Sequence, residues 1–179
     1  MSMFKKTVST VFVFTSLSLG LASLAQSQSV GLGTPVSESQ LGSLDRIVGP
    51  DGSGLPSGSG SAVEGQLVYE AKCQACHGAE GEGTSGNTRI VGGDMQSADT
   101  PIRTVGSFWP YATTIFDYVR RAMPADAPKS LTDTEVYQVT AYVLYMNGII
   151  NQSTVLNSET LAAIEMPNRE GFIDQSQIQ

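Results

Sequence analysis

Cys73-Gln74-Ala75-Cys76-His77 is the stretch of sequence that decides the fold, because it holds both cysteines and the only histidine of the 179-residue chain. The spacing Cys-x-x-Cys-His is that of a c-type haem attachment site. The two thiols can add to the two vinyl groups of one haem, and His77 can then bind the iron as the proximal ligand. The motif therefore predicts one covalently attached haem c, held by Cys73, Cys76 and His77.

Three other interpretations of this motif fit the sequence less well. A thioredoxin-like Cys-x-x-Cys needs a βαβ context, whereas the flanking residues predict a helix and a glycine-rich loop. A structural zinc site needs four ligands, and the chain has two cysteines and one histidine. A disulfide between the cysteines leaves His77 without a role. Haem attachment is the interpretation that uses all three side chains.

The N-terminal residues 1–25 have the features of a secretory signal. Lys5 and Lys6 precede a mostly apolar stretch over 8–24, and Ser23-Leu24-Ala25 fits a small-x-small cleavage site. A retained membrane anchor is the alternative, but Thr and Ser interrupt the apolar stretch, which is short for a span of about 20 residues. We therefore predict a periplasmic protein without a membrane span in its mature form. That compartment suits the motif, because haem is attached to thiols outside the cytoplasm.

The chain is acidic, with a formal net charge of −7. Removing residues 1–25 takes away two lysines and no acid, so the charge falls to −9. A chain this acidic is a poor ligand for nucleic acid or for an anionic membrane. The acidity either steers the protein towards a basic patch on a protein partner or only keeps it soluble, and the sequence favours neither explanation.

Composition and periodicity divide the first half of the mature chain into an arm, a helix and a loop. Residues 26–61 are rich in glycine, proline and serine and predict an extended arm. Residues 62–75 predict a helix that carries the haem cysteines near its C-terminal end, with Gly78 as a stop. Its apolar residues lie roughly on one face: Val63, Leu67, Val68 and Ala71. Residues 79–106 contain many glycines without a regular period and predict a loop.

Two further helices are expected after this loop. Residues 112–122 carry the i, i+3, i+4, i+7 apolar pattern of an amphipathic helix. Pro124 disfavours helical backbone at Met123, so this helix should end there. Residues 133–147 form the last clear helix, with apolar residues along one face.

The last helix begins with a capping box between Thr132 and Glu135, and residues 157–164 predict one more short helix. No stretch alternates apolar and polar residues convincingly over the length of a strand. We therefore predict an all-α fold of about three main helices around one covalent haem. The haem-binding domain covers residues 62–150, and residues 151–179 form a C-terminal arm. Three helices alone make a thin core, so we expect folding to depend on haem attachment.

The sixth ligand of the iron has to be something other than histidine, because His77 is the only one. The candidates are the methionines that remain after the signal is removed, or an open position. Met146 lies on the apolar face of the last helix, so we expect its side chain to pack in the core. Met95 is in the loop, and Met166 precedes a proline beyond the last helix. Met123 is the favoured ligand, because a helix ends there against a proline that fixes the backbone.

Taken together, these motifs resemble the class I c-type cytochromes. The order Cys73-Gln-Ala-Cys-His-Gly78, then a loop, then Met123-Pro124, then a capped helix containing Ala141-Tyr142, is that of the family. The resemblance covers residues 62–148. It implies that Gly65 and Tyr69 pack against the C-terminal helix near Tyr142. It also implies His/Met ligation, which favours Fe(II) and suits one-electron transfer.

A narrower resemblance is to the cytochrome subunits of bacterial sulfur oxidation, including the monohaem subunit of molybdenum-dependent sulfite dehydrogenase. It rests on 104–114, 120–124, 135–142, 147–150, Met166-Pro-Asn-Arg-Glu-Gly-Phe172 and Pro50-Asp-Gly-Ser-Gly-Leu-Pro56. In that group a cytochrome accepts electrons from a molybdopterin subunit that oxidises sulfite or protein-bound sulfane sulfur. The resemblance implies such a subunit as the partner and a cytochrome or oxidase as the downstream acceptor.

The resemblance also implies roles for residues outside the ligand set. Trp109 could line the haem with its indole N–H near a propionate; the alternative is a buried aromatic without haem contact. Arg120 and Arg121 either pair with a propionate or cover a helix surface. Many class I cytochromes have a proline after the motif whose carbonyl accepts from the proximal histidine. The matching stretch here is 88–90, so the residue that supplies this carbonyl is open.

Three functions remain for comparison. The leading one is an electron-transfer subunit, without substrate chemistry of its own, of a molybdenum enzyme that oxidises sulfite or related sulfur. Residues 26–61 and 151–179 would then be arms that order on the catalytic subunit. The second is a freely diffusing cytochrome that carries electrons to a terminal oxidase. The third is a haem enzyme with a displaceable sixth ligand, for which the chain has no second histidine as an acid–base group.

Overall fold

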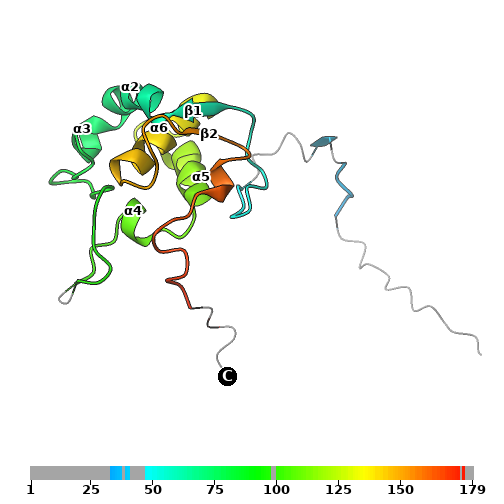
Figure 1. The fold of residues 1–179 in the computed structure, drawn as a ribbon. Coiled ribbons are helices and arrows are strands. Elements are labelled where there is room, and N and C mark those ends of the chain that lie inside the picture. The colour runs from blue at the N-terminus through cyan, green and yellow to red at the C-terminus, as the bar shows by residue number, and fades with distance from the viewer. Residues whose placement is uncertain (1–32, 38, 41–46, 98–99, 174, 176–179) are drawn as a thin grey trace, which may run out of the picture. The chain divides into compact units, whose positions relative to one another are not determined.

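The computed structural model describes residues 33–37, 39–40, 47–97, 100–173 and 175 (Figure 1). Residues 1–25, where an export signal is predicted, lie outside the described residues. The contacts divide the chain into two units, residues 1–43 and 44–179. All the candidate site residues belong to the second unit.

The elements of this second unit are short helices and two very short strands. In chain order they are β1 Ser59–Ser61, α2 Ala62–Lys72, α3 Gln74–His77, α4 Val105–Phe108, α5 Ala112–Ala122, α6 Asp133–Met146, β2 Val155–Asn157 and the 3-10 helix η1 Leu161–Ala163. The described part of the chain is therefore mostly helical, with five α-helices and little sheet. Two of the five, α3 and α4, are four-residue turns. No helix in the described ranges combines the length and apolar character that a bilayer span requires.

Helix capping explains where α2 and α6 begin. The hydroxyl of Thr132 accepts from the N–H of Glu135, and the Glu135 carboxylate accepts in return from the N–H of Thr132, which is the predicted capping box of α6. Ser61 and Glu64 form the same arrangement at the start of α2. The prediction for α5 is also confirmed: it spans Ala112–Ala122 and ends at Met123, whose backbone is extended.

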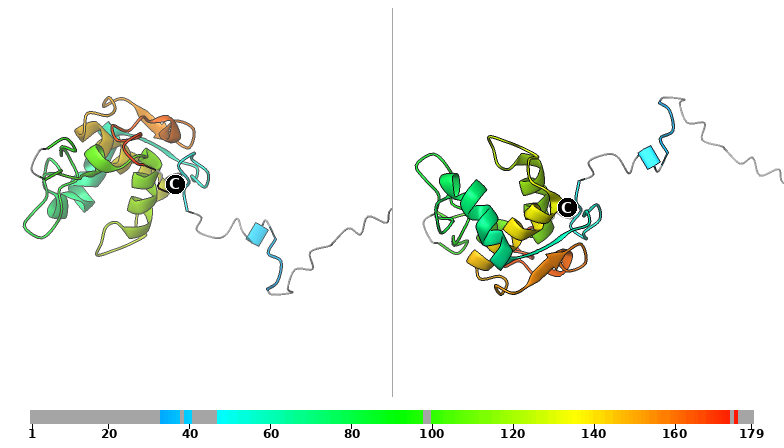
Figure 2. Two further views of the ribbon diagram at one scale, coloured as in Figure 1. Left: turned by 90° about the horizontal axis from the view of Figure 1, so that it is seen from below. Right: turned by 90° about the horizontal axis from the view of Figure 1, so that it is seen from above.

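The main packing contact of the unit is the crossing of α2 and α6, which both views of Figure 2 show. The buried Gly65 of α2 is in direct contact with the backbone of α6, and a Cβ there would overlap the carbonyl of Gln138. The rings of Tyr69 and Tyr142 pack together beside this crossing, with their centroids 5.3 Å apart. Thus Gly65 and Tyr69 face α6 near Tyr142, as the family resemblance implied.

The predicted apolar face of α2 is wrong. Val63 is 55% exposed and Leu67 is 71% exposed, while the buried residues of the helix are Ala62, Gly65 and Tyr69. Helix α2 contacts the backbone of α6 at Gly65. The buried face of α2 therefore consists of two small residues and one aromatic residue. Val63 and Leu67 face solvent, whereas Val68 is half-buried and packs against the core cluster. The helix also ends at Lys72, earlier than residue 75, because Cys73 departs from helical geometry with φ −125° and ψ −39°.

The segments on either side of the helices pair with each other. Strand β1 runs antiparallel to β2, with Ser59 opposite Asn157 and Ser61 opposite Val155. A helix was expected over 157–164; the chain instead forms β2 and the three-residue η1. The two strands were not predicted, because three residues are too few to show an alternating pattern of apolar and polar residues.

The described parts of the two predicted arms contribute to the core of the unit. Val48, Leu156, Leu161 and Met166 are buried in the same cluster as the helical residues. The hydroxyl of Tyr137 in α6 donates to the carbonyl of Pro56 at 2.9 Å. The division into arms 26–61 and 151–179 and a domain 62–150 stays a prediction about independent folding. In this structure, segments within both arms pack against the helices.

Candidate haem site

The haem motif lies at the junction of two helices. Cys73 ends α2, with its N–H bonded to the carbonyl of Tyr69 at 2.8 Å, and it also begins α3. The N–H groups of Cys76 and His77 both donate to the carbonyl of Cys73, at 3.1 and 3.0 Å. Both cysteines are free thiols; Cys73 is half-buried and Cys76 is exposed. This tight turn brings the two thiols and the imidazole into one short stretch of backbone, in which each is available for bonding.

The imidazole of His77 is held by one backbone carbonyl. Its Nδ1 lies 3.3 Å from the carbonyl oxygen of Thr88. A carbonyl oxygen can only accept, so Nδ1 carries the proton in this contact, and the neutral ring then has its free lone pair on Nε2. This is the tautomer that a metal-binding histidine needs. The sequence narrowed the source of this carbonyl to residues 88–90, and the structure identifies Thr88.

A short loop brings Thr88 back to the motif. The N–H of Gly83 donates to the carbonyl of His77 at 2.7 Å, and the N–H of Ile90 donates to the carbonyl of Gly81 at 2.9 Å. Gly81 is buried with φ +73°, and a Cβ there would overlap Val91. Only glycine meets both demands without strain, so the loop after the motif can close tightly enough to place Thr88 beside His77.

Burial changes the chemistry of one of the two thiols. Removal from water raises the pKa of the Cys73 thiol to about 11, although the Lys72 ammonium acts in the opposite direction. At neutral pH this side chain is therefore a protonated and poorly nucleophilic thiol in the folded chain. Thioether formation at Cys73 is favoured before the fold closes over it.

The predicted sixth ligand, Met123, directly follows α5. Its N–H donates to the carbonyl of Val119 at 3.0 Å, and its backbone is extended with φ −118° and ψ 148°. The side chain is half-buried. In both views of Figure 2, the loop after α5 projects to the same side of the unit as α3 and the loop that follows it. Ligation of the iron by Met123 stays a prediction.

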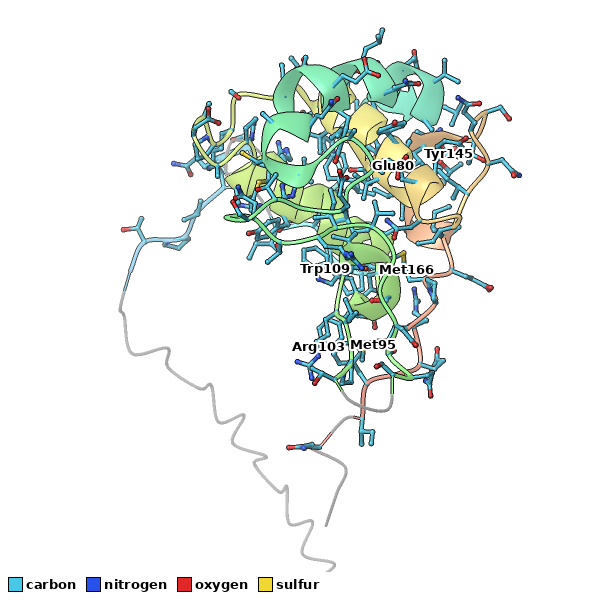
Figure 3. All side chains as sticks on the ribbon, turned by 90° about the vertical axis from the view of Figure 1, so that its left-hand side faces the viewer. Glu80, Met95, Arg103, Trp109, Tyr145 and Met166 are labelled. Carbon is cyan, nitrogen blue, oxygen red and sulfur yellow. The ribbon has the colours of Figure 1, made fainter. Side chains whose placement is uncertain are left out.

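The other methionines occupy different positions. Met166 is 3% exposed and is part of the core cluster. Met146 is half-buried and packs against the same cluster. Met95 lies at the far end of the loop, away from α2 and α3, as Figure 3 shows. Core packing explains the positions of Met166 and Met146.

The aromatic and basic residues assigned by resemblance have protein partners. Trp109 is half-buried and its ring meets that of Tyr118 edge-on, with centroids 5.6 Å apart. Nε of Arg120 bonds Asp133 Oδ1 and Nε of Arg121 bonds Asp117 Oδ1, each at 2.8 Å. These ion pairs hold both guanidinium groups on protein carboxylates, and pairing of either arginine with a propionate stays a prediction. Contact of Trp109 with a haem stays a prediction.

These side chains fit a haem c. The exposed and half-buried thiols match the two thioether positions, and the imidazole has the correct tautomer for the proximal ligand. Met123 can supply the distal thioether. When bound, the haem supplies one-electron redox chemistry. The contribution of the chain is to hold the ligands, to orient His77 through Thr88 and to pack apolar residues around the site.

Comparisons with known proteins agree with this site. The family model described as cytochrome c oxidase, cbb3-type, subunit III matches residues 60–143. The crystal structure of the sulfane dehydrogenase SoxCD from Paracoccus pantotrophus matches with a TM-score of 0.75 and 36% sequence identity, over 84% of this chain and 76% of that chain. The chain belongs to the c-type cytochromes. Its similarity to sulfur-oxidation cytochromes, inferred from the sequence, is likewise confirmed.

A curated protein gives a second match in sulfur metabolism. The cytochrome is 31% identical over 123 residues to the thiosulfate dehydrogenase of Allochromatium vinosum. That alignment covers 66% of this chain and 40% of the dehydrogenase. The cytochrome thus spans less than half the length of this relative.

Proposed function

We propose that this chain is a periplasmic monohaem cytochrome that accepts single electrons from a molybdopterin-containing, sulfur-oxidising subunit and passes them to a downstream cytochrome or oxidase. Sulfite and sulfane sulfur are oxidised by two electrons at a time. A protein with one haem takes one electron at a time, so each oxidation requires two successive transfers. A downstream acceptor is therefore part of the proposal.

The observation that carries this proposal is the extent of the match to the sulfane dehydrogenase. That match covers 84% of the chain, whereas the general cytochrome model covers only residues 60–143. The similarity therefore extends beyond residues 60–143 into flanking sequence. Electron-transfer function needs only the haem-binding part. Shared flanking segments favour a shared assembly with a catalytic partner.

Purification of the native protein tests the partner. We expect molybdenum and iron to co-elute in comparable amounts with this cytochrome and a second, larger polypeptide, and sulfite or a sulfane donor to reduce the complex. N-terminal sequencing of the same material tests the export signal, with a mature start near residue 26. Elution of the full-length cytochrome alone, free of molybdenum and unreactive with sulfur compounds, would favour the freely diffusing electron carrier.

The match to thiosulfate dehydrogenase favours a second candidate, a haem enzyme with a displaceable sixth ligand. Such an enzyme has to admit substrate to the iron, and the purified cytochrome alone should then oxidise thiosulfate. Carbon monoxide distinguishes the two candidates. An electron-transfer cytochrome with Met123 in place should show little change in its reduced spectrum, whereas a large shift would support the enzyme.

A further inference from the structure

The side chain of Asn147 lies where three segments of the chain meet. Its Nδ2 donates to the carbonyl of Ile90 at 3.3 Å and to the carbonyl of Val143 at 2.8 Å. Its Oδ1 accepts from the N–H of Gly92 at 3.0 Å. The buried Gly106 of α4 packs directly on this amide, since a Cβ at Gly106 would overlap it. The amide therefore joins the end of α6 to the loop 90–92 through both its donor and its acceptor.

The same loop is fixed from its other side. The N–H of Ile90 donates to the carbonyl of Gly81, directly after the haem motif. The hydroxyl of Thr104, at the start of α4, donates to the carbonyl of Gly92. Residues 90–92 are thus held between the loop that follows the motif and the C-terminal end of α6.

The connection to the iron ligand is short. Only Arg89 separates Ile90 from Thr88, whose carbonyl accepts from Nδ1 of His77. A backbone fixed at Ile90 and Gly92 leaves the Thr88 carbonyl little freedom to turn away from the imidazole. Without the Asn147 amide, the segment keeps its bonds to Gly81 and Thr104 and loses its attachment to the end of α6.

We propose that Asn147 is a positioning residue for the iron-binding histidine. Its amide sets the position of residues 88–92 and so keeps the Thr88 carbonyl on Nδ1 of His77. Hydrogen bonding at Nδ1 controls the orientation of the ring and the basicity of Nε2. This inference rests on the proposed function only in requiring that haem is attached at His77; it does not depend on the partner.

Proton exchange at His77 tests the proposal. In the reduced, haem-loaded cytochrome, NMR spectroscopy follows the exchange of the Nδ1 proton of His77 with solvent. We expect Asn147→Ala to accelerate this exchange about tenfold, because the Thr88 contact opens more often, and to shift the midpoint potential. Unchanged exchange in haem-loaded Asn147→Ala would overturn the proposal.

Thr132→Ala is the matched control, because it removes the N-cap at the other end of the same helix. It should destabilise α6 and leave the Nδ1 exchange rate within about twofold of the wild type. Equal acceleration in Thr132→Ala and Asn147→Ala would show a general loss of stability and overturn the proposal. A wild-type protein without attached haem would instead contradict haem binding itself, which separates the two failures.

Asn147→Asp tests the positioning role of the amide if Asn147→Ala does not fold. The carboxylate keeps the shape of the amide and the acceptor for the N–H of Gly92, but it loses the donor to the carbonyls of Ile90 and Val143. We expect an exchange rate between those of the wild type and Asn147→Ala. A wild-type rate in Asn147→Asp would overturn the role of the Ile90 contact.

Discussion

At the scale of single residues, the haem motif was predictable, but the hydrogen bonds that orient its histidine were not. Cys73, Cys76 and His77 are adjacent in sequence and have few alternative uses, so spacing alone identifies them. The orienting contact of His77 comes from a backbone carbonyl, which every residue possesses, so the family resemblance indicated residues 88–90 without singling out Thr88. The contacts of Asn147 with residues 90 and 92 cross more than fifty positions of sequence, so no local pattern indicates them.

The sixth ligand gives the first prediction at this scale. Met123→Leu should retain covalent haem, lose the spectroscopic features of low-spin His/Met ligation and have a lower midpoint potential, because a thioether stabilises Fe(II). The expected change is a sizeable part of the range of about 0.8 V that axial ligation spans. Optical spectroscopy and potentiometric titration measure both effects.

Met166→Leu is the control for this experiment. Met166 is buried in the core, so a substitution of similar volume should cost less than about 1.5 kcal/mol and leave the potential unchanged. The opposite result, an altered potential in Met166→Leu and a normal one in Met123→Leu, would reassign the ligand.

At the scale of elements, local signals fixed some boundaries, and packing decided which face is buried. The amphipathic pattern of α5 and the capping box of α6 are local, and both helices begin where predicted. The buried face of α2 depends on the close approach of α6, which a pattern of large apolar residues cannot reveal. The four-residue α4 is too short to show a helical period.

The crossing of α2 and α6 gives a prediction about stability. Gly65→Ala should lower the free energy of unfolding by about 1–3 kcal/mol, because the added methyl group would overlap the carbonyl of Gln138. The gain in helix propensity, at most about 1 kcal/mol, works in the opposite direction. Gly86→Ala is the control, since a Cβ at Gly86 meets no atom within 4 Å. Denaturant titration compares the variants, and equal midpoints would contradict the packing argument.

The ion pair between α2 and α6 gives a prediction about pH. Lys72 donates to Glu135 at 2.6 Å, and this bond, together with the N–H of Thr132, holds the pKa of Glu135 below its ordinary value. A lowered carboxyl pKa stabilises the fold above the unfolded-state value of about 4.3 and loses its effect as pH falls through the folded-state value.

Glu135→Gln should therefore cost about 0.5–1 kcal/mol at pH 7 and progressively less as the pH is lowered towards 3. Glutamine preserves the capping geometry, so the variant isolates the charge. A Lys72→Met/Glu135→Gln double-mutant cycle, measured by unfolding at both pH values, assigns the difference to the pair. A coupling that is the same at pH 3 and pH 7 would contradict the assignment.

At the scale of the whole molecule, the short helices enclose a small apolar core that the haem would complete. Fold class followed from the sequence because helical periods and caps are local. The contribution of residues 48–56 and 155–166 to the core did not, because both segments were expected to belong to arms outside the haem-binding domain.

Haem attachment should consequently determine the stability of the whole unit. Cys73→Ser/Cys76→Ser removes both thioether bonds, and we expect its cooperative thermal unfolding transition to be lost or lowered by more than about 10 °C. Circular dichroism of the wild-type and double-variant proteins measures this. Cys76→Ser alone, with one thioether bond left, should fall between them.

The acidic charge of the whole chain predicts the salt dependence of its reactions. If a basic surface on the partner attracts the cytochrome, raising the ionic strength from about 0.01 to about 0.15 M should slow second-order electron transfer about tenfold, because screening shortens the reach of the field. Stopped-flow reduction by the purified partner measures the rate. A rate independent of salt would leave solubility as the role of the charge.

The pairing of Ser59 with Asn157 also determines the order in which the protein can be completed. A polypeptide that emerges N-terminus first, from a ribosome or a membrane pore, presents β1 and the Cys-x-x-Cys-His turn long before β2 and α6 exist to cover them. Contacts between such distant positions form late. During this interval Cys73 is still in water and has an ordinary thiol reactivity. The order of synthesis therefore leaves time for thioether formation, which burial of Cys73 in the finished fold would hinder.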